Sequence, residues 1–222
     1  DIDNNISNLD PSLNQLPEPL IKALIKYTSS DDESDSLSSS PKLLPIQQKS
    51  YQIISKGNDA VLFSPTGTGK SLAFILPLAA RLLEWKHDGS LNYKKEAQKQ
   101  RFIQQQRKRD RNDSFSSTQP VVDPAEPSIL IVEPSRELAR QVGKIWGKFH
   151  PTAVKSSKRQ VVTVYGGVPM ARHAAMLSSK TDVVIGTPGR IRELIREKYL
   201  STSKLRSIVL DEGDTLLNFK DN

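Results

Sequence analysis

Short aliphatic runs alternate with longer amphipathic stretches over the larger part of this chain. Short segments of four or five mostly apolar residues, bounded by polar or turn-forming residues, are found at 60–63, 129–132, 161–165, 182–185 and 207–210. Runs of this length predict buried strands, whereas the stretches between them have the spacing of helices. Buried strands that alternate with helices predict an α/β fold, in which a mostly parallel sheet is covered by helices on both faces.

Helices are expected both before and between these strands. The spacing of leucine and isoleucine predicts one from Leu16 to Tyr27, and Pro45 can open another that runs to about Ser55. Further helices are predicted from 71 to about 85, from 135 to about 148, at 170–178 and from 188 to about 198. The first of these contains Pro77, which we expect to kink it.

The N-terminal flank and the segments that connect the predicted elements differ in composition from the strands and helices. Residues 29–40 form an acidic, serine-rich run that predicts a mobile surface loop. We therefore expect a flank at 1–44, with a helix and this loop, followed by a domain at 45–222. An insertion at about 86–127 interrupts that domain. The chain begins with Asp1 and ends in a short polar run, so we expect a fragment of a longer protein.

The first predicted strand leads directly into a glycine-bearing turn and then a helix. The residues of the turn are Ser64, Pro65, Thr66, Gly67, Thr68, Gly69, Lys70 and Ser71. Such a turn points backbone N–H groups and a helix N-terminus at one place, which suits a phosphate. Lys70 adds a cation for the β- and γ-phosphates, and the Ser71 hydroxyl can reach Mg²⁺. The stretch is a P-loop with Ser64 at the first glycine position; the alternative is an ordinary strand–turn–helix connection.

Acidic residues follow the last predicted strand, in the order Asp211, Glu212, Gly213 and Asp214. Beside a P-loop, an acidic residue at the end of a buried strand can hold Mg²⁺, usually through water. A neighbouring glutamate can orient and deprotonate the attacking water. Because acidic residues are also common at turns, this interpretation depends on the P-loop.

Composition narrows the possible partners and sites. The net charge of +7 and the pI of about 9.5 favour a polyanionic partner such as nucleic acid. The chain has no cysteine, which excludes disulfides and thiolate metal sites. Its three histidines show no metal-ligand spacing, and no apolar run approaches the roughly 20 residues that span a bilayer. We therefore expect no membrane partner.

Much of the positive charge lies in the insertion. Residues 94–111 contain eight lysines and arginines against one glutamate and one aspartate, a net charge of +6. Two interpretations stay open: a solvated charged helix, or an arm that faces RNA.

These motifs together resemble the first RecA-like domain of a DEAD-box ATP-dependent RNA helicase. Pro45-Ile46-Gln47 resembles the Q motif, which implies that Gln47 reads the adenine edge of ATP. Residues 64–71 resemble motif I, and residues 211–214 resemble motif II, with Gly213 where the family has alanine. The resemblance implies ATP and Mg²⁺ as cofactors, with Lys70, Asp211 and Glu212 as the catalytic residues and Ser71 and Asp211 as the metal-holding ones.

Three further motifs resemble the RNA-binding segments of that family. Motif Ia corresponds to Pro134, Ser135 and Arg136, the paired glycines to Gly166 and Gly167, and motif Ib to Thr187, Pro188, Gly189 and Arg190. The resemblance implies contacts with the RNA backbone that are largely independent of sequence and sensitive to salt. RNA would then be preferred over DNA through its 2′-hydroxyl groups.

Some features depart from the family pattern. No Phe or Trp precedes Gln47, and Tyr27 is the one aromatic residue in the region where the family has an adenine-stacking side chain. The Ser-Ala-Thr segment and the second RecA-like domain, which in the family supplies arginine fingers, are missing. We expect the isolated chain to be nearly inactive.

The resemblance also leaves the biological role open between two classes. One is an RNA helicase or chaperone that acts in ribonucleoprotein or ribosome assembly; the other is a non-unwinding RNA-binding factor with weak or absent ATPase activity. Gly213 and the basic insertion resemble fungal mitochondrial members involved in large-ribosomal-subunit assembly. The mitochondrial matrix is therefore the favoured compartment, with the nucleus or nucleolus as the alternative.

Overall fold

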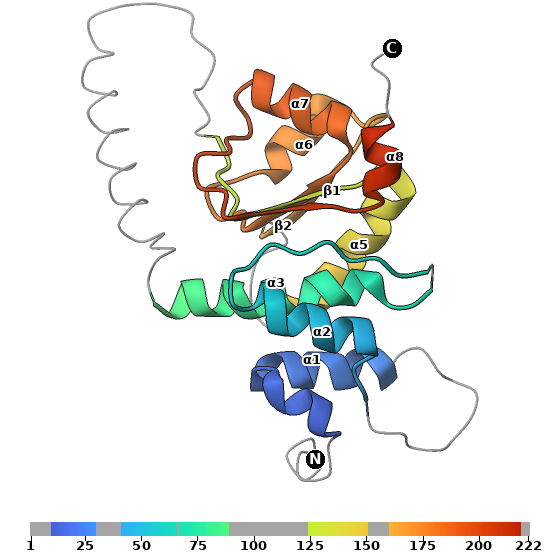
Figure 1. The fold of residues 1–222 in the computed structure, drawn as a ribbon. Helices are drawn as coiled ribbons and strands as arrows, with labels where there is room; N and C mark the ends of the chain where they lie inside the picture. The colour runs from blue at the N-terminus through green and yellow to red at the C-terminus, as the bar shows by residue number, and fades with distance from the viewer. Residues whose placement is uncertain (1–9, 30–40, 66, 89–123, 151–159, 219–222) are drawn as a thin grey trace, which may run out of the picture. The chain divides into compact units, whose positions relative to one another are not determined.

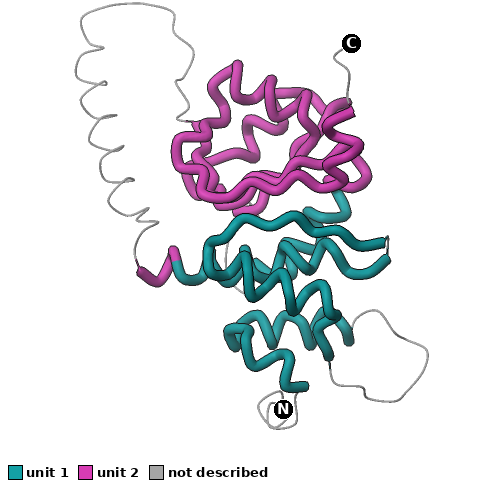
Figure 2. Tube along the Cα trace, viewed as in Figure 1, with its two compact units in different colours: residues 1–84, 140–156 teal, residues 85–139, 157–222 magenta. Residues whose placement is uncertain are grey.

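The chain forms two compact units in the computed structural model, which describes residues 10–29, 41–65, 67–88, 124–150 and 160–218 (Figures 1 and 2). Unit 1 comprises residues 1–84 and 140–156, and unit 2 comprises residues 85–139 and 157–222. The serine-rich run at 30–40 and residues 89–123 of the predicted insertion lie outside the described residues.

A four-stranded parallel sheet forms the centre of unit 2. Its strands are β1 (Ile129–Val132), β2 (Val161–Val164), β3 (Val183–Gly186) and β4 (Ser207–Leu210), in the spatial order β2-β3-β1-β4. Val132 of β1 is in register with both Gly186 of β3 and Leu210 of β4. The carboxyl ends of these strands therefore meet at one edge, where an open α/β sheet carries its ligand sites.

The helices of unit 2 follow the predicted alternation. They are the start of α5 (Arg136–Phe149), α6 (Met170–Met176), α7 (Pro188–Arg196) and the short α8 (Gly213–Leu217). Figure 1 shows α6 and α7 over one face of the sheet. Ile191 and Leu194 of α7 join the same buried cluster as Val162, Val164 and Val184 of the strands. This packing confirms the predicted α/β class.

Unit 1 is helical among the described residues. It contains the 3₁₀ turn η2 (Pro11–Gln15), α1 (Glu18–Ser29), α2 (Pro45–Ile54), most of α3 (Lys70–His87) and the later part of α5. α3 continues through Pro77. The hydroxyl of Ser50 in α2 donates a hydrogen bond to the Ala73 carbonyl of α3 at 2.7 Å. This bond joins the two helices that flank the P-loop segment.

Tyr27 belongs to the packing of α1 against α5. Its ring centroid lies 5.4 Å from that of Phe149, and the Lys148 ammonium lies 4.5 Å from the Tyr27 centroid. An aromatic pair with a cation over one ring stabilises the junction of these helices. The ring is therefore engaged in helix packing.

The predicted buried strand at 60–63 is wrong. These residues join no strand among those described, and Val61 and Phe63 are 98% and 96% exposed. Strand structure depends on a hydrogen-bonded neighbour, which an apolar run cannot supply by itself. The prediction of full burial also fails for β4, where Ile208 and Leu210 are 58% and 52% exposed.

The remaining boundaries agree with the sequence to within a few residues. α6 ends at Met176 and α7 at Arg196, each two residues before the predicted end. No helix in the described ranges has the length and apolar content needed to cross a membrane.

Candidate functional site

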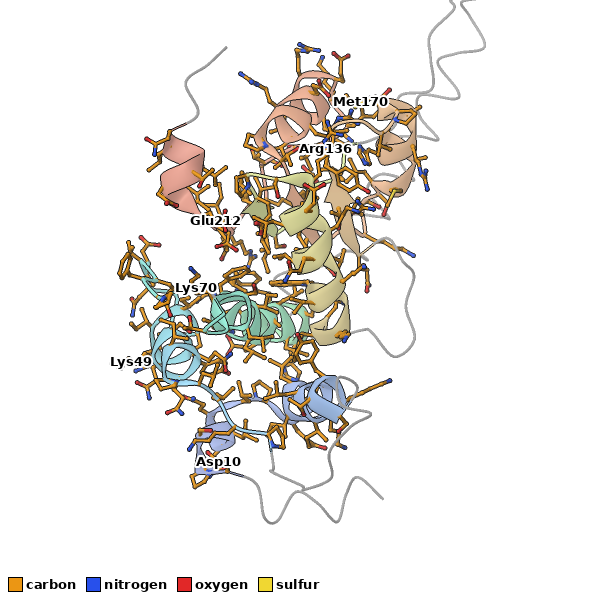
Figure 3. The ribbon with its side chains drawn as sticks, turned by 90° about the vertical axis from the view of Figure 1, so that its right-hand side faces the viewer. Asp10, Lys49, Lys70, Arg136, Met170 and Glu212 are labelled. Carbon is orange, nitrogen blue, oxygen red and sulfur yellow. The ribbon has the colours of Figure 1, made fainter. Side chains whose placement is uncertain are left out.

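The P-loop segment has the backbone conformation that its glycines predict. Gly67 and Gly69 have φ angles of +80° and +79°, in the left-handed region that side chains disfavour. α3 begins directly afterwards at Lys70, which Figure 3 labels. Thr66 lies outside the described residues. The segment therefore ends in a helix N-terminus, whose first N–H groups have no partner within the helix, and this setting favours anions.

Polar groups within the P-loop bond to one another. The Lys70 ammonium donates to the Ser64 carbonyl oxygen at 2.8 Å, and the Thr68 hydroxyl donates to the Pro65 carbonyl oxygen at 2.7 Å. The hydroxyls of Ser64 and Thr68 are also hydrogen-bonded to each other. The serine at the first glycine position thus supports the turn. A neutral carbonyl binds an ammonium more weakly than a phosphate oxygen does, so Lys70 can exchange one for the other.

Gln47 is buried beside the P-loop. Its Oε1 accepts a hydrogen bond from the Leu44 N–H at 2.9 Å, and its Nε2 donates to the Gly69 carbonyl oxygen at 3.3 Å. A Cβ on Gly69 would lie only 2.4 Å from that Nε2. Gln47 therefore connects the start of α2 to the P-loop, a contact that the sequence analysis missed. The sequence carried a signal only for the bond to Leu44, because glutamine at the third helical position commonly reaches back to the cap N–H.

The acidic edge of unit 2 begins where β4 ends. The Asp211 N–H donates to the Val132 carbonyl oxygen at 3.1 Å, which continues the β1–β4 ladder by one residue. Glu212, labelled in Figure 3 beside α8, has a φ of 46°, and its N–H donates to Asp211 Oδ1 at 2.9 Å. A non-glycine residue in this conformation is held there by its surroundings at some cost in energy. The two predicted catalytic carboxylates are thus adjacent at the sheet edge.

Glu133 is a third carboxylate at this edge, and the sequence analysis missed it. Its side chain is fully buried, and within the described ranges neither carboxylate oxygen has a hydrogen-bond partner. Burial, followed by the charges of Asp211 and Glu212, raises the pKa of Glu133 to about 8. The available signal was a glutamate directly after the aliphatic run at 129–132.

The predicted RNA-binding residues of motif Ia and the paired glycines come together in unit 2. A Cβ on Gly167 would lie 2.5 Å from Nη1 of Arg136, and one on Gly166 would lie 3.5 Å from its Nη2. Gly167 also has a φ of +82°. The guanidinium therefore rests against the glycine backbone, and a side chain at Gly167 would have to displace it. The Ser135 hydroxyl accepts a hydrogen bond from the Leu138 N–H at 3.2 Å and caps α5.

Arg190 of motif Ib also bonds to the loop that contains the paired glycines. Its Nη1 donates to the Val168 carbonyl oxygen at 2.7 Å and lies 2.8 Å from His173 Nδ1. Its Nε lies 2.8 Å from a carboxylate oxygen of Glu193. Burial, followed by Arg190 and Arg172, lowers the pKa of His173. A neutral His173 can accept from Arg190, so these side chains form a support for the loop.

The start of α7 supplies the other predicted residues of motif Ib. Thr187 is the N-cap of this helix, and its hydroxyl makes no capping bond. Pro188 occupies the first turn, where its missing N–H costs nothing. A Cβ on Gly189 would meet no atom within 4 Å among the described residues. This helix start is therefore open to a ligand on its glycine side.

The acidic edge has the chemistry of a water-mediated magnesium site. Asp211 and Glu212 present carboxylate oxygens, which Mg²⁺ prefers. No group of three or more His, Cys, Asp or Glu side chains in the described part of the chain is placed to hold a metal ion. The buried, unpartnered oxygens of Glu133 also lie at this edge. The donor set fits an ion that keeps most of its water.

A glycine-bearing loop at a helix start, together with acidic residues at the carboxyl edge of a parallel sheet, defines the α/β class of P-loop nucleotide-binding proteins. The family described as "DEAD/DEAH box helicase" matches residues 44–222, which is most of the chain. The chain belongs to this family.

Curated relatives agree with the assignment. The chain is 32% identical over 176 residues to nucleolar RNA helicase 2 of Rattus norvegicus, which covers 79% of this chain and 18% of that protein. It is 34% identical over 176 residues to DEAD-box ATP-dependent RNA helicase 53 of Oryza sativa subsp. japonica, covering 79% and 23%. DEAD-box ATP-dependent RNA helicase 9, mitochondrial, of Arabidopsis thaliana is 30% identical over 178 residues, covering 79% and 23%. The chain thus spans about a fifth of the length of these relatives.

Solved structures share the fold. The RNA helicase Prp28 of Chaetomium thermophilum, bound to ADP, has a TM-score of 0.60 and 22% identity, over 95% of this chain and 39% of that one. A DEAD box protein of Methanococcus jannaschii has a TM-score of 0.59 and 21% identity, over 91% and 41%. These similarities confirm the predicted RecA-like α/β fold.

Proposed function

We propose that the chain is the first RecA-like domain of an ATP-dependent RNA helicase or RNA chaperone, which binds ATP with Mg²⁺ and the backbone of RNA. The observation that carries the proposal is the P-loop geometry. Its two glycines have positive φ, α3 starts at Lys70, and the Lys70 ammonium rests on a neutral carbonyl. Family membership over residues 44–222 supports the same function.

The P-loop residues would hold the triphosphate. The backbone N–H groups of residues 64–71 and the start of α3 would bind phosphate oxygens. Lys70 would leave the Ser64 carbonyl and bind the β- and γ-phosphates. Gln47 would read the adenine edge. Because its side-chain amide bonds to Gly69, the same amide would couple adenine recognition to the P-loop.

The acidic residues would serve the metal ion and the attacking water. Ser71 and Asp211 would hold Mg²⁺, with Asp211 acting through water. When bound, the ion neutralises phosphate charge. Glu212 would accept the proton of the attacking water, a step for which general bases supply roughly 10²–10⁴-fold in rate.

Contacts between the predicted RNA-binding residues of unit 2 support a common binding site. Arg136 lies against Gly166 and Gly167, and Arg190 holds the same loop through Val168. We propose that the phosphodiester backbone crosses this loop and the starts of α5 and α7, at Pro134, Ser135, Thr187, Pro188 and Gly189. Arg190 would act by positioning the loop, since its side chain is only 10% exposed. Contacts of this kind carry little sequence information.

Turnover would require the rest of the protein. We propose that a second RecA-like domain supplies arginines for the transition state, which are worth roughly a thousandfold or more in related NTPases. The test is RNA-stimulated ATP hydrolysis by the full-length protein and by its Glu212→Gln variant. We expect RNA to stimulate wild-type turnover, and the variant to bind ATP but lose at least about a hundredfold in rate.

The competing function is a non-unwinding RNA-binding assembly factor, favoured by Gly213 in motif II. If RNA binds the full-length protein but ATP turnover is absent and the Glu212→Gln variant behaves as wild type, this competing function is correct. Duplex unwinding assays then separate a helicase from a clamp.

For the biological role, we propose RNA remodelling in ribonucleoprotein or ribosome assembly, with the mitochondrial matrix as the compartment and the nucleus or nucleolus as the alternative. The relatives include proteins named as nucleolar and as mitochondrial. Crosslinking of the full-length protein to cellular RNA tests both points, because the RNA recovered identifies target and compartment together. Recovery of mitochondrial large-subunit rRNA would support the proposal, and enrichment of nuclear RNA alone would overturn the matrix assignment.

A further inference from the structure

The unusual feature of the acidic edge is Glu133, which lies beside Asp211. The β1–β4 register pairs Ile131 with Val209 and Val132 with Leu210, and the Asp211 N–H continues that ladder. Because strand side chains alternate between faces, residues in register project on the same face. Glu133 and Asp211 therefore stand side by side, each one residue beyond the end of its strand, and neighbouring strands lie about 4.8 Å apart.

A carboxylate in this position is costly unless something binds it. Glu133 is fully buried, and both of its oxygens lack a hydrogen-bond partner in the described residues. Buried carboxylates are normally paired or hydrogen-bonded, since desolvating an unpaired charge carries a large penalty. The neighbouring charges of Asp211 and Glu212 add repulsion. This edge consequently favours a positively charged or strongly donating ligand.

The structure argues against two simple occupants of this position. No lysine or arginine in the described residues forms an ion pair or hydrogen bond with Glu133. Direct coordination of a metal ion by three side chains is also excluded for the described residues, because no such group converges. A ligand that donates hydrogen bonds to Glu133 without being coordinated directly by three side chains fits both findings.

We propose that Glu133 is a positioning residue that accepts hydrogen bonds from the water shell of the divalent cation held at Asp211. The inference rests on the proposed function, since it uses the Mg²⁺ site of an ATP-binding domain. Mg²⁺ gives up its water reluctantly, and several of its ligands in nucleotide sites remain water molecules. Water on a divalent cation is a stronger hydrogen-bond donor than bulk water, and two adjacent carboxylates offer it acceptors on one face.

The contribution of such a positioning residue to metal affinity can be estimated. Groups that orient the ligands of a metal typically contribute 10–100-fold to its affinity. We therefore expect Glu133→Gln to lose about tenfold of the gain in ATP affinity that Mg²⁺ provides. The gain is the ratio of the dissociation constant for a fluorescent ATP analogue in EDTA to that in saturating Mg²⁺, measured on the full-length protein.

Two controls separate positioning from folding. In EDTA, we expect the Glu133→Gln protein to bind the analogue as wild type does, and to melt no lower than wild type because a neutral amide of similar shape replaces the buried carboxyl group. Glu197→Gln, an exposed substitution at the end of α7, should leave the Mg²⁺-dependent gain unchanged. Asp211→Asn should reduce the gain at least as much as Glu133→Gln does.

The possible outcomes distinguish this inference from the proposed function. An Mg²⁺-dependent gain within twofold of wild type in Glu133→Gln, with a clear loss in Asp211→Asn, overturns the role of Glu133 and leaves the ATP site intact. A variant that melts lower and binds the analogue more weakly even in EDTA also overturns it, because Glu133 is then structural. If wild type binds no ATP analogue at all, the proposed function fails first.

Discussion

The P-loop and the acidic sheet edge satisfy their polar groups in opposite ways. In the P-loop, the hydroxyls of Ser64 and Thr68 and the ammonium of Lys70 all have partners within the segment itself. At the acidic edge, Glu133 is buried with no hydrogen-bond partner in the described residues. A segment whose bonds are local is set by its own sequence, whereas the edge depends on residues brought together by strand pairing. In the P-loop, Lys70 can exchange the Ser64 carbonyl for a phosphate oxygen. At the acidic edge, Glu133 can still accept a hydrogen bond or bind a cation.

The largest expected effect concerns the pH dependence of stability at the acidic edge. The folded-state pKa of Glu133, about 8, lies above its ordinary value of 4.5, so the folded protein binds more protons than the unfolded one between these values. The free energy of unfolding should therefore be highest below about pH 4.5 and fall as pH rises through 8. Each pKa unit corresponds to about 1.4 kcal/mol, and we expect this group to contribute a fall of about 3–4 kcal/mol between pH 5 and 8.

Urea unfolding of wild type and Glu133→Gln across this pH range measures the effect. The substitution should flatten the decline, because the glutamine cannot ionise. If both proteins show the same pH dependence, then the pKa of Glu133 is not raised in the folded protein. The proposed difference between the acidic edge and the P-loop is then wrong.

A smaller effect is expected from Gly69→Ala in the P-loop. The φ of +79° disfavours any side chain, and a Cβ would lie 2.4 Å from Gln47 Nε2 and 3.0 Å from Leu44 Cδ1. We expect a loss of about 1–2 kcal/mol in the free energy of unfolding and weaker ATP binding. Gly147→Ala in α5 is the matched control, since its Cβ meets no atom within 4 Å in the described ranges. That control should gain about 0.5–1 kcal/mol, and an equal loss in both variants would contradict the assigned geometry.

The smallest effect is expected from Ser64→Gly, which gives the P-loop a glycine at its first position. It removes the hydrogen bond between the Ser64 and Thr68 hydroxyls, worth about 0.5–1.5 kcal/mol. The Ser64 carbonyl that holds Lys70 remains. ATP affinity should stay within about twofold of wild type in equilibrium titrations. A collapse of affinity would mean that the serine itself contacts the nucleotide.

The same contrast explains how much the sequence could predict. The P-loop conformation, the starts of α5 and α7, and the alternation of strands and helices in unit 2 depend on local spacing, and these were predicted. The place of Glu133 at the acidic edge was missed because it depends on the pairing of β1 with β4, two strands that are far apart in the chain. The bond from Gln47 to Gly69 was missed for the same reason.

The wrong prediction at 60–63 has a related cause. An apolar run indicates that a segment prefers burial, but a strand also needs a hydrogen-bonded neighbour, and no described strand pairs with it. Val61 and Phe63 are therefore exposed despite their hydrophobicity. The contact between His173 and Arg190 was also missed. His173 belongs to no sequence motif, and only the fold brings it next to Arg190.

The central claim is that Lys70 holds the phosphates of ATP, and equilibrium binding of a fluorescent ATP analogue in Mg²⁺ tests it most directly. Wild type, Lys70→Ala and the control Lys49→Ala, an exposed lysine of α2, should be compared on the same protein. We predict that Lys70→Ala weakens binding by at least about a hundredfold, as expected when a charge-assisted contact with phosphate is lost, and that Lys49→Ala binds as wild type does. Equal affinity in all three proteins would contradict the assignment of the P-loop as the nucleotide site.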